Sequence, residues 1–267
     1  MLKYLLLACV CVIAYLFIKA SARKGNTVIR TVTHLDPMSK VWRNVATAGC
    51  ISQKMKAFDV RAGFIAPLNT NGRINSLMLS EGWTLQENGR LGAAEFIASE
   101  NFDSRPVGVD IRLLVVHCIS LPPGRFNGGH VESFFTNSLD FDAHPYFRTI
   151  RGLKVSAHFF IDRAGCLKQF VSCGDRAWHA GASVWRGISG CNDFSIGIEL
   201  EGQDTQEFES AQYKTLLTLA RVLMANFPIE ACVGHSDIAT PTGRKRDPGA
   251  KFDWGRLRVL EGIELPN

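Results

Sequence analysis

The chain has 267 residues, of which 46% are hydrophobic and 21% charged, and this composition excludes disordered and fibrous classes in favour of a globular protein. The formal net charge of +5 is unevenly distributed. Residues 1–77 hold 11 basic and two acidic residues, whereas residues 78–267 hold 19 basic and 23 acidic ones. The larger part is therefore mildly acidic, which argues against nucleic-acid binding.

The cysteine pattern bears on the redox compartment. Of the eight cysteines, five lie beyond residue 77 and cannot all pair with one another, and no C-x-x-C motif occurs. This usage is typical of free, mostly buried thiols in a reducing compartment. We therefore predict a cytoplasmic protein. We also predict that four cysteines are small residues packed in its core: Cys166, Cys173, Cys191 and Cys232.

The first 77 residues differ in kind from the rest. An apolar run over residues 4–18 is shorter than the roughly 20 residues that a spanning helix needs, and basic residues flank it. The segment could be a membrane anchor with a linker, a cleaved export signal, or upstream sequence before a true start at Met78. The charge break and the absence of Glu before Glu81 favour the last interpretation. We predict a domain boundary between residues 1–77 and 78–267.

Beyond residue 78, strands and helices are predicted to alternate. Apolar or alternating runs indicate strands over residues 111–117, 155–161, 167–171, 195–200 and 230–234. Helices are predicted over residues 131–136, over residues 210–226 and from Trp254 onward. The longest of them repeats apolar residues from Tyr213 to Phe227 on one face, and Pro228 stops it. This order predicts an α+β or α/β three-layer fold with a central mixed sheet flanked by helices.

Five polar residues follow or end these elements. His117 ends the first predicted strand, Glu199 lies in the fourth, and His235 follows the fifth, while Lys245 and Asp247 share the next loop. Two imidazoles and a carboxylate form a ligand set that zinc accepts with one position open. An amide hydrolase also needs a base and a cation facing the oxyanion. From spacing alone, a hydrogen-bonded core histidine and a solvated lysine remain the alternative.

A series of sequence motifs favours the zinc-site interpretation over this alternative. In chain order they are LVVHCISLPPG (114–124), AHPYF (143–147), VSAH (155–158), RAWHAG (176–181), CNDFSIGIELEG (191–202), GHSDIA (234–239) and DPGAKFDW (247–254). Together they closely resemble the 1,6-anhydro-N-acetylmuramyl-L-alanine amidases of cell-wall recycling, which are related to peptidoglycan recognition proteins. The resemblance runs from about Met78 to Leu260. No counterpart is recognised for residues 1–77.

The resemblance implies a site and a reaction. His117, His235 and Asp247 would bind one zinc ion per chain at one edge of the sheet, Glu199 would be the base that activates water, and Lys245 would stabilise the oxyanion. The implied reaction is hydrolysis of the amide between N-acetylmuramic acid and L-alanine in small, soluble muropeptides. The enzyme would act in the cytoplasm as a monomer, and it would meet a membrane only if residues 1–25 were a working anchor or signal.

Two departures from the family pattern affect this site. Cys118 stands where Asn is expected after the first ligand, and its side chain should point away because adjacent strand residues face opposite sides. The loop between Ile238 and Lys245 is about two residues longer than usual. Arg244 or Arg246 could therefore supply the charge assigned to Lys245.

Further residues are candidates for substrate contact. Trp178 could pack on the sugar or the peptide, with His179 beside it in the same motif. His158 could bind substrate or orient a ligand, and Lys154 and Arg176 could pair with peptide carboxylates. For each of them the alternative is a structural or solvated side chain.

Two rival functions remain. One is an exported or membrane-anchored amidase acting on intact peptidoglycan, which would require the N-terminal segment to be an export signal. The other is a non-catalytic peptidoglycan-recognition module. Such relatives usually lose a zinc ligand, whereas here the predicted set is complete.

Overall fold

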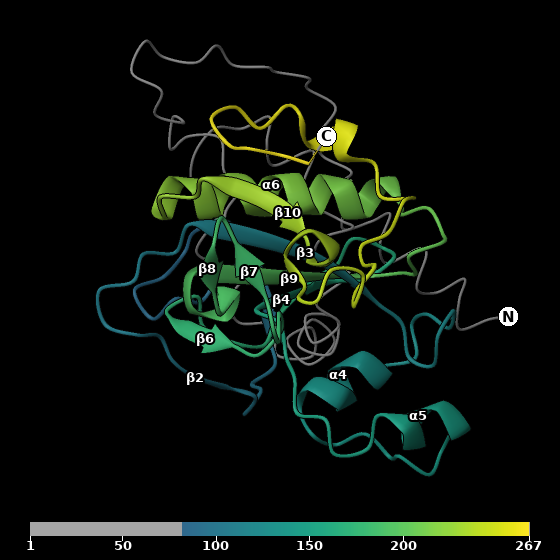
Figure 1. Ribbon diagram of the computed structural model, residues 1–267. Helices are drawn as coiled ribbons and strands as arrows, with labels where there is room; N and C mark the ends of the chain where they lie inside the picture. Colours follow the sequence, from purple (N-terminus) through teal and green to yellow (C-terminus); the bar gives the residue numbers. More distant parts are fainter. Residues whose placement is uncertain (1–81, 267) are drawn as a thin grey trace, which may run out of the picture. The chain divides into compact units, whose positions relative to one another are not determined.

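The centre of the fold is a six-stranded sheet with strand order β1-β5-β4-β9-β3-β10, of which β4, β9, β3 and β10 are labelled in Figure 1. The computed structural model describes residues 82–266, so the predictions for residues 1–77 and for the boundary after them lie outside the described residues. In sheet order, the strands are Glu95–Phe96, Leu167–Gln169, Phe159–Ile161, Ser195–Glu201, Leu113–Ile119 and Ala231–Gly234. The predicted mixed sheet is confirmed.

Strand direction decides where a site can form. β4, β9, β3 and β10 run parallel, while β5 is antiparallel to β4 and parallel to β1. Leu113, Leu114, Val115 and Val116 of β3 are all 0% exposed, as expected for a parallel strand covered on both faces. The carboxyl ends of the parallel strands meet at one edge, where ligands bind in open sheets of this kind.

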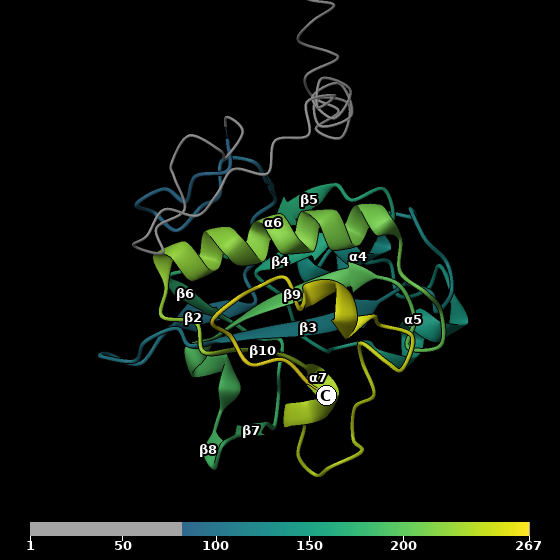
Figure 2. The same cartoon turned by 90° about the horizontal axis from the view of Figure 1, so that it is seen from above.

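Helix α6 covers one face of this sheet (Figure 2) and spans Ser210–Asn226, as predicted. It begins with a capping box between Glu209 and Gln212, and Pro228 follows its end. Its buried side packs against alternate residues of the central strands, including Leu114, Val116, Ile196, Ile198 and Leu200. Among the residues that the structure describes, no helix is both long and apolar enough to cross a membrane.

Shorter elements cover the other face: α4 (His130–Phe135), α5 (Pro145–Thr149), the hairpin β7–β8 (Val184–Trp185 and Ile188–Ser189), the 3-10 helix η3 (Cys191–Phe194) and α7 (His235–Ile238). Leu113 and Val115 pack against Trp185 and Phe194, and α4 and α5 contribute to a second cluster around Phe160. Both sheet faces are therefore covered, which confirms the three-layer architecture.

Some predicted elements are shorter than expected. The strand predicted from residue 155 begins only at Phe159, and the helix predicted from Trp254 is a single 3-10 turn, Trp254–Leu257. A small second sheet of β2 (Phe102–Ser104) and β6 (Asp175–Ala177) was not predicted. Strands of two or three residues contain too few positions to show a period.

The cysteine prediction is confirmed in part. Cys118, Cys173, Cys191 and Cys232 are free thiols, and burial raises the pKa of Cys173 and of Cys232 to about 12, so these two are unreactive. Cys166 was predicted to be a free core thiol, and this was wrong, because it is disulfide-bonded.

Candidate active site

The first two functional side chains come from adjacent parallel strands. His117 of β3 lies opposite Glu199 of β9 in the strand register. Because Leu114 and Val116 face α6, strand alternation places His117 on the other face of the sheet. Cys118 packs against the α6-side core, which confirms that its side chain points away from that of His117.

The next two side chains are brought to the same edge by a turn and a loop. His235 is the first residue of α7, directly after β10 ends at Gly234. The N–H of Ser236 donates to the backbone carbonyl of Asp247 at 2.9 Å, which fixes the loop to the start of the helix. A Cβ on Gly234 would lie 2.7 Å from the ring of Pro248, so glycine is required for this close approach.

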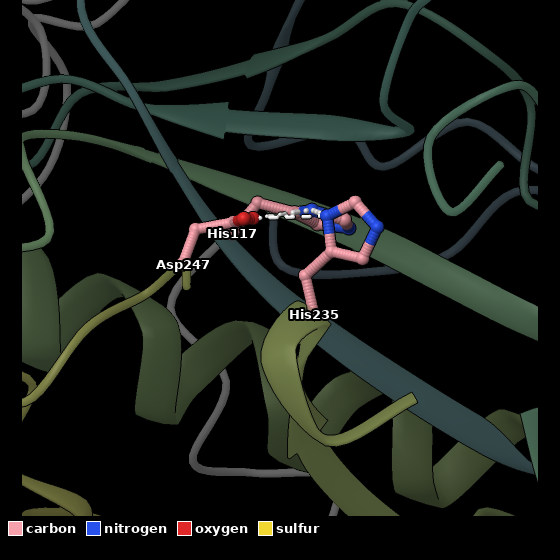
Figure 3. A group of neighbouring side chains, drawn as sticks. All are labelled: His117, His235 and Asp247. Atoms are coloured by element: carbon pink, nitrogen blue, oxygen red, sulfur yellow. Dashed lines mark hydrogen bonds and ion pairs between the residues drawn. The ribbon is translucent and has the colours of Figure 1, made fainter. Parts of the chain in front are cut away.

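Three potential ligand atoms converge at this edge (Figure 3). Nδ1 of His117 lies 3.0 Å from Nδ1 of His235 and 3.1 Å from Oδ2 of Asp247, and Nδ1 of His235 lies 3.0 Å from the same oxygen. Such spacing allows one ion to contact all three atoms at the roughly 2.0–2.2 Å that zinc takes with nitrogen and oxygen. The structure thus brings the three predicted ligands together.

The hydrogen bonds of the two imidazoles fit metal binding through Nδ1. Nε2 of His235 faces the carbonyl oxygen of Ala180 at 3.0 Å, so in the neutral ring Nε2 carries the proton and Nδ1 the lone pair. Nε2 of His117 lies 3.0 Å from Nδ1 of His179, whose Nε2 lies 3.2 Å from Oγ of Ser195. A chain of donors running from His117 to Ser195 leaves Nδ1 of His117 free to bind a cation.

The charges of the ligands also fit. Burial lowers the pKa of His117 to about 4, although the neighbouring carboxylate of Asp247 opposes this shift. For Asp247, burial alone would raise the pKa, but the neighbouring side chains of His117 and His235 outweigh burial and lower the pKa below its usual range. The pKa shifts therefore favour a neutral His117 and an ionised Asp247, the forms that bind metal.

Glu199 has an unusual environment. Its Oε2 is buried without a hydrogen-bond partner among the described residues, a condition shared there only with Oδ1 of Asn101. Burial and the charge of Asp247 raise the pKa of Glu199 well above its usual range, and the charge of Lys245 opposes this. A carboxylate tuned upward beside a metal site is suited to take and return a proton near neutral pH.

Three cations follow one another in the loop before Asp247, and their surroundings differ. Arg244 donates to the backbone carbonyls of Thr240 and Ala182 at 2.9 and 2.6 Å. Arg246 pairs with Asp204 at 3.3 Å, and its side chain is 85% exposed. The positive charge of Lys245 acts on both His117 and Glu199. Of the three, Lys245 is the cation electrically coupled to the site.

A cleft of about 450 Å³ opens over these residues. Its lining includes the ligand set, Glu199 and Lys245, and an apolar wall formed in part by Phe134, Tyr146, Ile150 and Leu153. Sequence reasoning did not find this wall. Its one available signal was the aromatic content of 134–147, which a buried helix would show equally.

The predicted substrate contacts fall into two groups. Trp178 and His179 line the cleft, whereas His158 and Lys154 do not. His158 is 0% exposed, and its Nδ1 accepts the N–H of Gly197 at 3.0 Å. Arg176 forms ion pairs with Asp103 and Asp193, so its guanidinium has structural partners.

Comparison with known proteins agrees with this site. The sequence profile of the N-acetylmuramoyl-L-alanine amidases matches residues 107–250, a range that contains every residue of the candidate site. The chain belongs to this amidase family. The amidase is 50% identical over 173 residues to the 1,6-anhydro-N-acetylmuramyl-L-alanine amidase AmpD of Haemophilus influenzae, covering 64% of this chain and 93% of that protein.

Further relatives extend the comparison. The amidase is 49% identical over 190 residues to AmpD of Escherichia coli strain K12, covering 70% of this chain and 99% of that protein. A crystal structure of a selenomethionine AmpD derivative superposes with a TM-score of 0.63 at 47% identity, covering 66% of this chain and 98% of that chain. The family and the fold predicted from the sequence are confirmed.

Proposed function

We propose that this amidase uses one zinc ion to hydrolyse the amide between 1,6-anhydro-N-acetylmuramic acid and L-alanine in soluble muropeptides. The observation that carries the proposal is the convergence of the Nδ1 atoms of His117 and His235 with Oδ2 of Asp247, at 3.0 to 3.1 Å from one another. The names of the AmpD relatives from H. influenzae and E. coli support the substrate.

In this proposal the three ligands hold the ion. The ion would supply Lewis acidity toward a carbonyl oxygen and would lower the pKa of the attacking water. The neutral imidazoles and the ionised Asp247 give the set a single negative charge, and the cleft leaves one side of the set open to substrate. This donor set favours zinc over magnesium or calcium, which prefer oxygen ligands.

Glu199 is the proposed proton carrier. Glu199 is the register partner of His117 in the sheet, and its buried Oε2 has no protein partner among the described residues. It would take a proton from the attacking water and return it to the amine of the departing L-alanine. General acid–base catalysis of this kind contributes about 10²–10⁴-fold to rate.

Lys245 is the proposed oxyanion partner. Attack on the lactyl carbonyl places negative charge on its oxygen, and a fixed cation beside the site stabilises that charge. The exposed ammonium group of Lys245 borders the cleft, and Arg244 is already held by backbone carbonyls.

The cleft also suggests how substrate is held. Trp178 lines the cleft and would pack on the sugar or the peptide. Lys154 is exposed and stands between the cleft-lining residues Leu153 and Val155, although it does not line the cleft itself, and it would pair with a carboxylate of the stem peptide. His158 is fully buried and His179 is hydrogen-bonded to His117, so we now propose that both support the site rather than bind substrate.

We further propose that the enzyme acts in the cytoplasm on muropeptides released during cell-wall recycling, and that residues 78–267 form the catalytic domain. All proposed site residues come from a single chain, so a monomer would suffice. Fractionation of cells that produce the native protein, followed by detection with an antibody, tests the location. Recovery with the membrane or in the exported fraction would contradict it.

The deciding experiment is hydrolysis of purified 1,6-anhydro-N-acetylmuramyl tripeptide, followed by mass spectrometry. The full chain and residues 78–267 are assayed with and without a chelator, and intact sacculi serve as the competing substrate. We expect free tripeptide, loss of activity with the chelator and recovery with zinc. Preference for sacculi would support an envelope amidase. No cleavage by folded, zinc-loaded protein would support a recognition module instead.

A further inference from the structure

The two proposed ligand histidines are oriented by consecutive residues of one segment. Nε2 of His117 lies 3.0 Å from Nδ1 of His179, and Nε2 of His235 lies 3.0 Å from the carbonyl oxygen of Ala180. A small shift of this segment would therefore disturb both imidazoles at once. What holds residues 179 and 180 in place thus sets the geometry of the whole ligand set.

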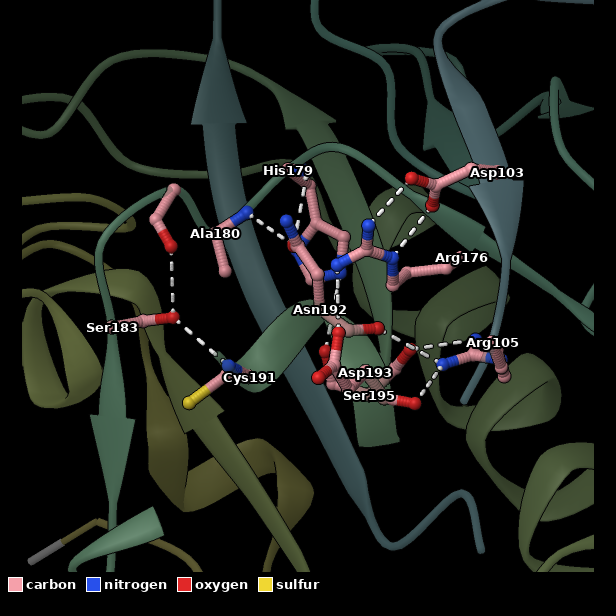
Figure 4. A network of polar contacts seen from close by, with 11 residues as sticks. Asp103, Arg105, Arg176, His179, Ala180, Ser183, Cys191, Asn192, Asp193 and Ser195 are labelled. Carbon is pink, nitrogen blue, oxygen red and sulfur yellow. Dashed lines mark hydrogen bonds and ion pairs between the residues drawn. The ribbon is translucent and has the colours of Figure 1, made fainter. Parts of the chain in front are cut away.

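The backbone N–H groups of this segment are held by the side chain of Asn192 (Figure 4), and Nη2 of Arg244 donates to the carbonyl oxygen of Ala180 at 3.3 Å. Oδ1 of Asn192 accepts the backbone N–H of His179 at 3.2 Å and that of Ala180 at 2.8 Å. Because both partners are N–H donors, only the carbonyl oxygen of the Asn192 amide can face them. We propose that Asn192 is a positioning residue, which clamps residues 179 and 180 so that they orient both metal-binding histidines. This inference rests on the ligand set proposed above.

The clamp is itself anchored. Asn192 belongs to η3, and Arg105 donates to the backbone carbonyls of Asn192, Asp193 and Ser195 at 3.0, 2.9 and 2.8 Å. Arg176 donates to Oδ1 of Asp193 at 2.8 Å. Two guanidinium groups thus fix this turn, and a fixed turn can hold a second segment in one position.

The ring of His179 is fixed from a further side. Gly197 lies in β9 beneath it, and a Cβ on Gly197 would lie 2.4 Å from Cγ of the ring. The ring also stands edge-on to that of His117, with centroids 5.1 Å apart. With Asn192 holding its backbone and Gly197 leaving room for its ring, His179 is confined to the position in which it accepts from His117.

The test is the affinity of the full-length protein for Zn²⁺, measured by competition with a chromophoric chelator. Asn192→Ala removes the acceptor and should weaken zinc binding about 10–100-fold, as loss of groups behind metal ligands does. Asn192→Asp keeps an oxygen facing the two N–H groups and should bind zinc nearly as the parent does. Gly197→Ala leaves the Asn192 side chain unchanged but should displace the His179 ring, and it should therefore also weaken zinc binding.

Two controls separate positioning from folding. Asn226→Ala removes an amide hydrogen bond to the Val222 carbonyl in α6 and should leave zinc affinity unchanged. The visible absorption spectrum of the Co²⁺-substituted protein reports coordination, and it should change for Asn192→Ala and not for Asn226→Ala. If Asn192→Ala does not fold, Asn192→Ser, whose side chain is too short to reach both amides, takes its place.

The outcomes distinguish this inference from the proposed function. His117→Ala should lose zinc binding, and if it binds as the parent does, the ligand set is wrong and the clamp has no site to serve. If His117→Ala loses zinc while Asn192→Ala changes only thermal stability, the clamp alone is overturned. Equal weakening in Asn192→Ala and Asn192→Asp would also contradict it, because the acceptor oxygen would then not be the cause.

Discussion

The role of a single carboxylate can be tested at Glu199. We expect Glu199→Gln to lower turnover of the anhydro-muropeptide by about 10²–10⁴-fold, because the amide cannot carry the proton. Zinc content should stay at one ion per chain, since Glu199 is not among the converging ligand atoms. Turnover is measured by release of free peptide and zinc by elemental analysis. A variant that retains more than a tenth of the parent activity would place the base elsewhere.

The adjacent cations of the loop can be separated by paired substitutions. Lys245→Ala should lower kcat by about 10²–10³-fold, the usual effect of removing one oxyanion partner, with little change in Tm because the residue is exposed. Arg244→Ala should mainly lower Tm, because it removes hydrogen bonds to Thr240 and Ala182. Steady-state kinetics and thermal unfolding of both variants decide. Loss of turnover only in Arg244→Ala, with the zinc content unchanged, would show that the oxyanion partner was misassigned, whereas loss together with zinc would reflect the contact of Arg244 with Ala180.

The residues of the site differ in how far sequence could find them. His117, Glu199 and His235 stand in or directly after predicted strands, so their convergence follows from parallel strand ends meeting at one edge. Asn192 shows no such signal, because its contacts with residues 179 and 180 depend on how two loops are folded. His158 was a candidate for substrate contact only because its burial cannot be read from a motif.

At the scale of elements, long periodic segments were predictable and short ones were not. The 17-residue helix α6 has an apolar face, a capping box and a proline stop, and its bounds agree with the prediction. β1, β2 and β6 have two or three residues each and form only because distant partners pair with them. Their existence depends on tertiary contacts rather than on local pattern.

The packing of α6 gives a prediction for this element. Leu216 is 0% exposed in the core beneath the helix, and Leu216→Ala should lower the free energy of unfolding by about 2–5 kcal/mol. Leu217, one position along, is only partly buried, so Leu217→Ala is a matched control with a smaller loss. Urea denaturation of both variants measures the difference. Equal losses would mean that the helix presents a different face to the sheet.

At the scale of the whole molecule, buried histidines couple stability to pH. Burial and the charge of Arg105 lower the pKa of His158 to about 3, against about 6.5 in an unfolded chain. Between these values the unfolded chain binds a proton that the folded protein does not. The stability contributed by neutral His158 is therefore complete above about pH 6.5 and decreases as the pH falls toward 3.

This linkage predicts a measurable difference between two proteins. From pH 7 to pH 5, the His158 contribution should fall by about 2 kcal/mol. In His158→Gln the amide oxygen can still accept the N–H of Gly197, but the side chain does not titrate. Between pH 7 and pH 5, the unfolding free energy of this variant should therefore fall by about 2 kcal/mol less than that of the parent. Urea unfolding of the metal-free parent and of the metal-free variant at pH 7, 6 and 5 measures this difference. His117 and His179 contribute equally to the pH dependence of the two proteins, so their effect cancels. Parallel pH profiles would show that His158 accepts a proton without unfolding.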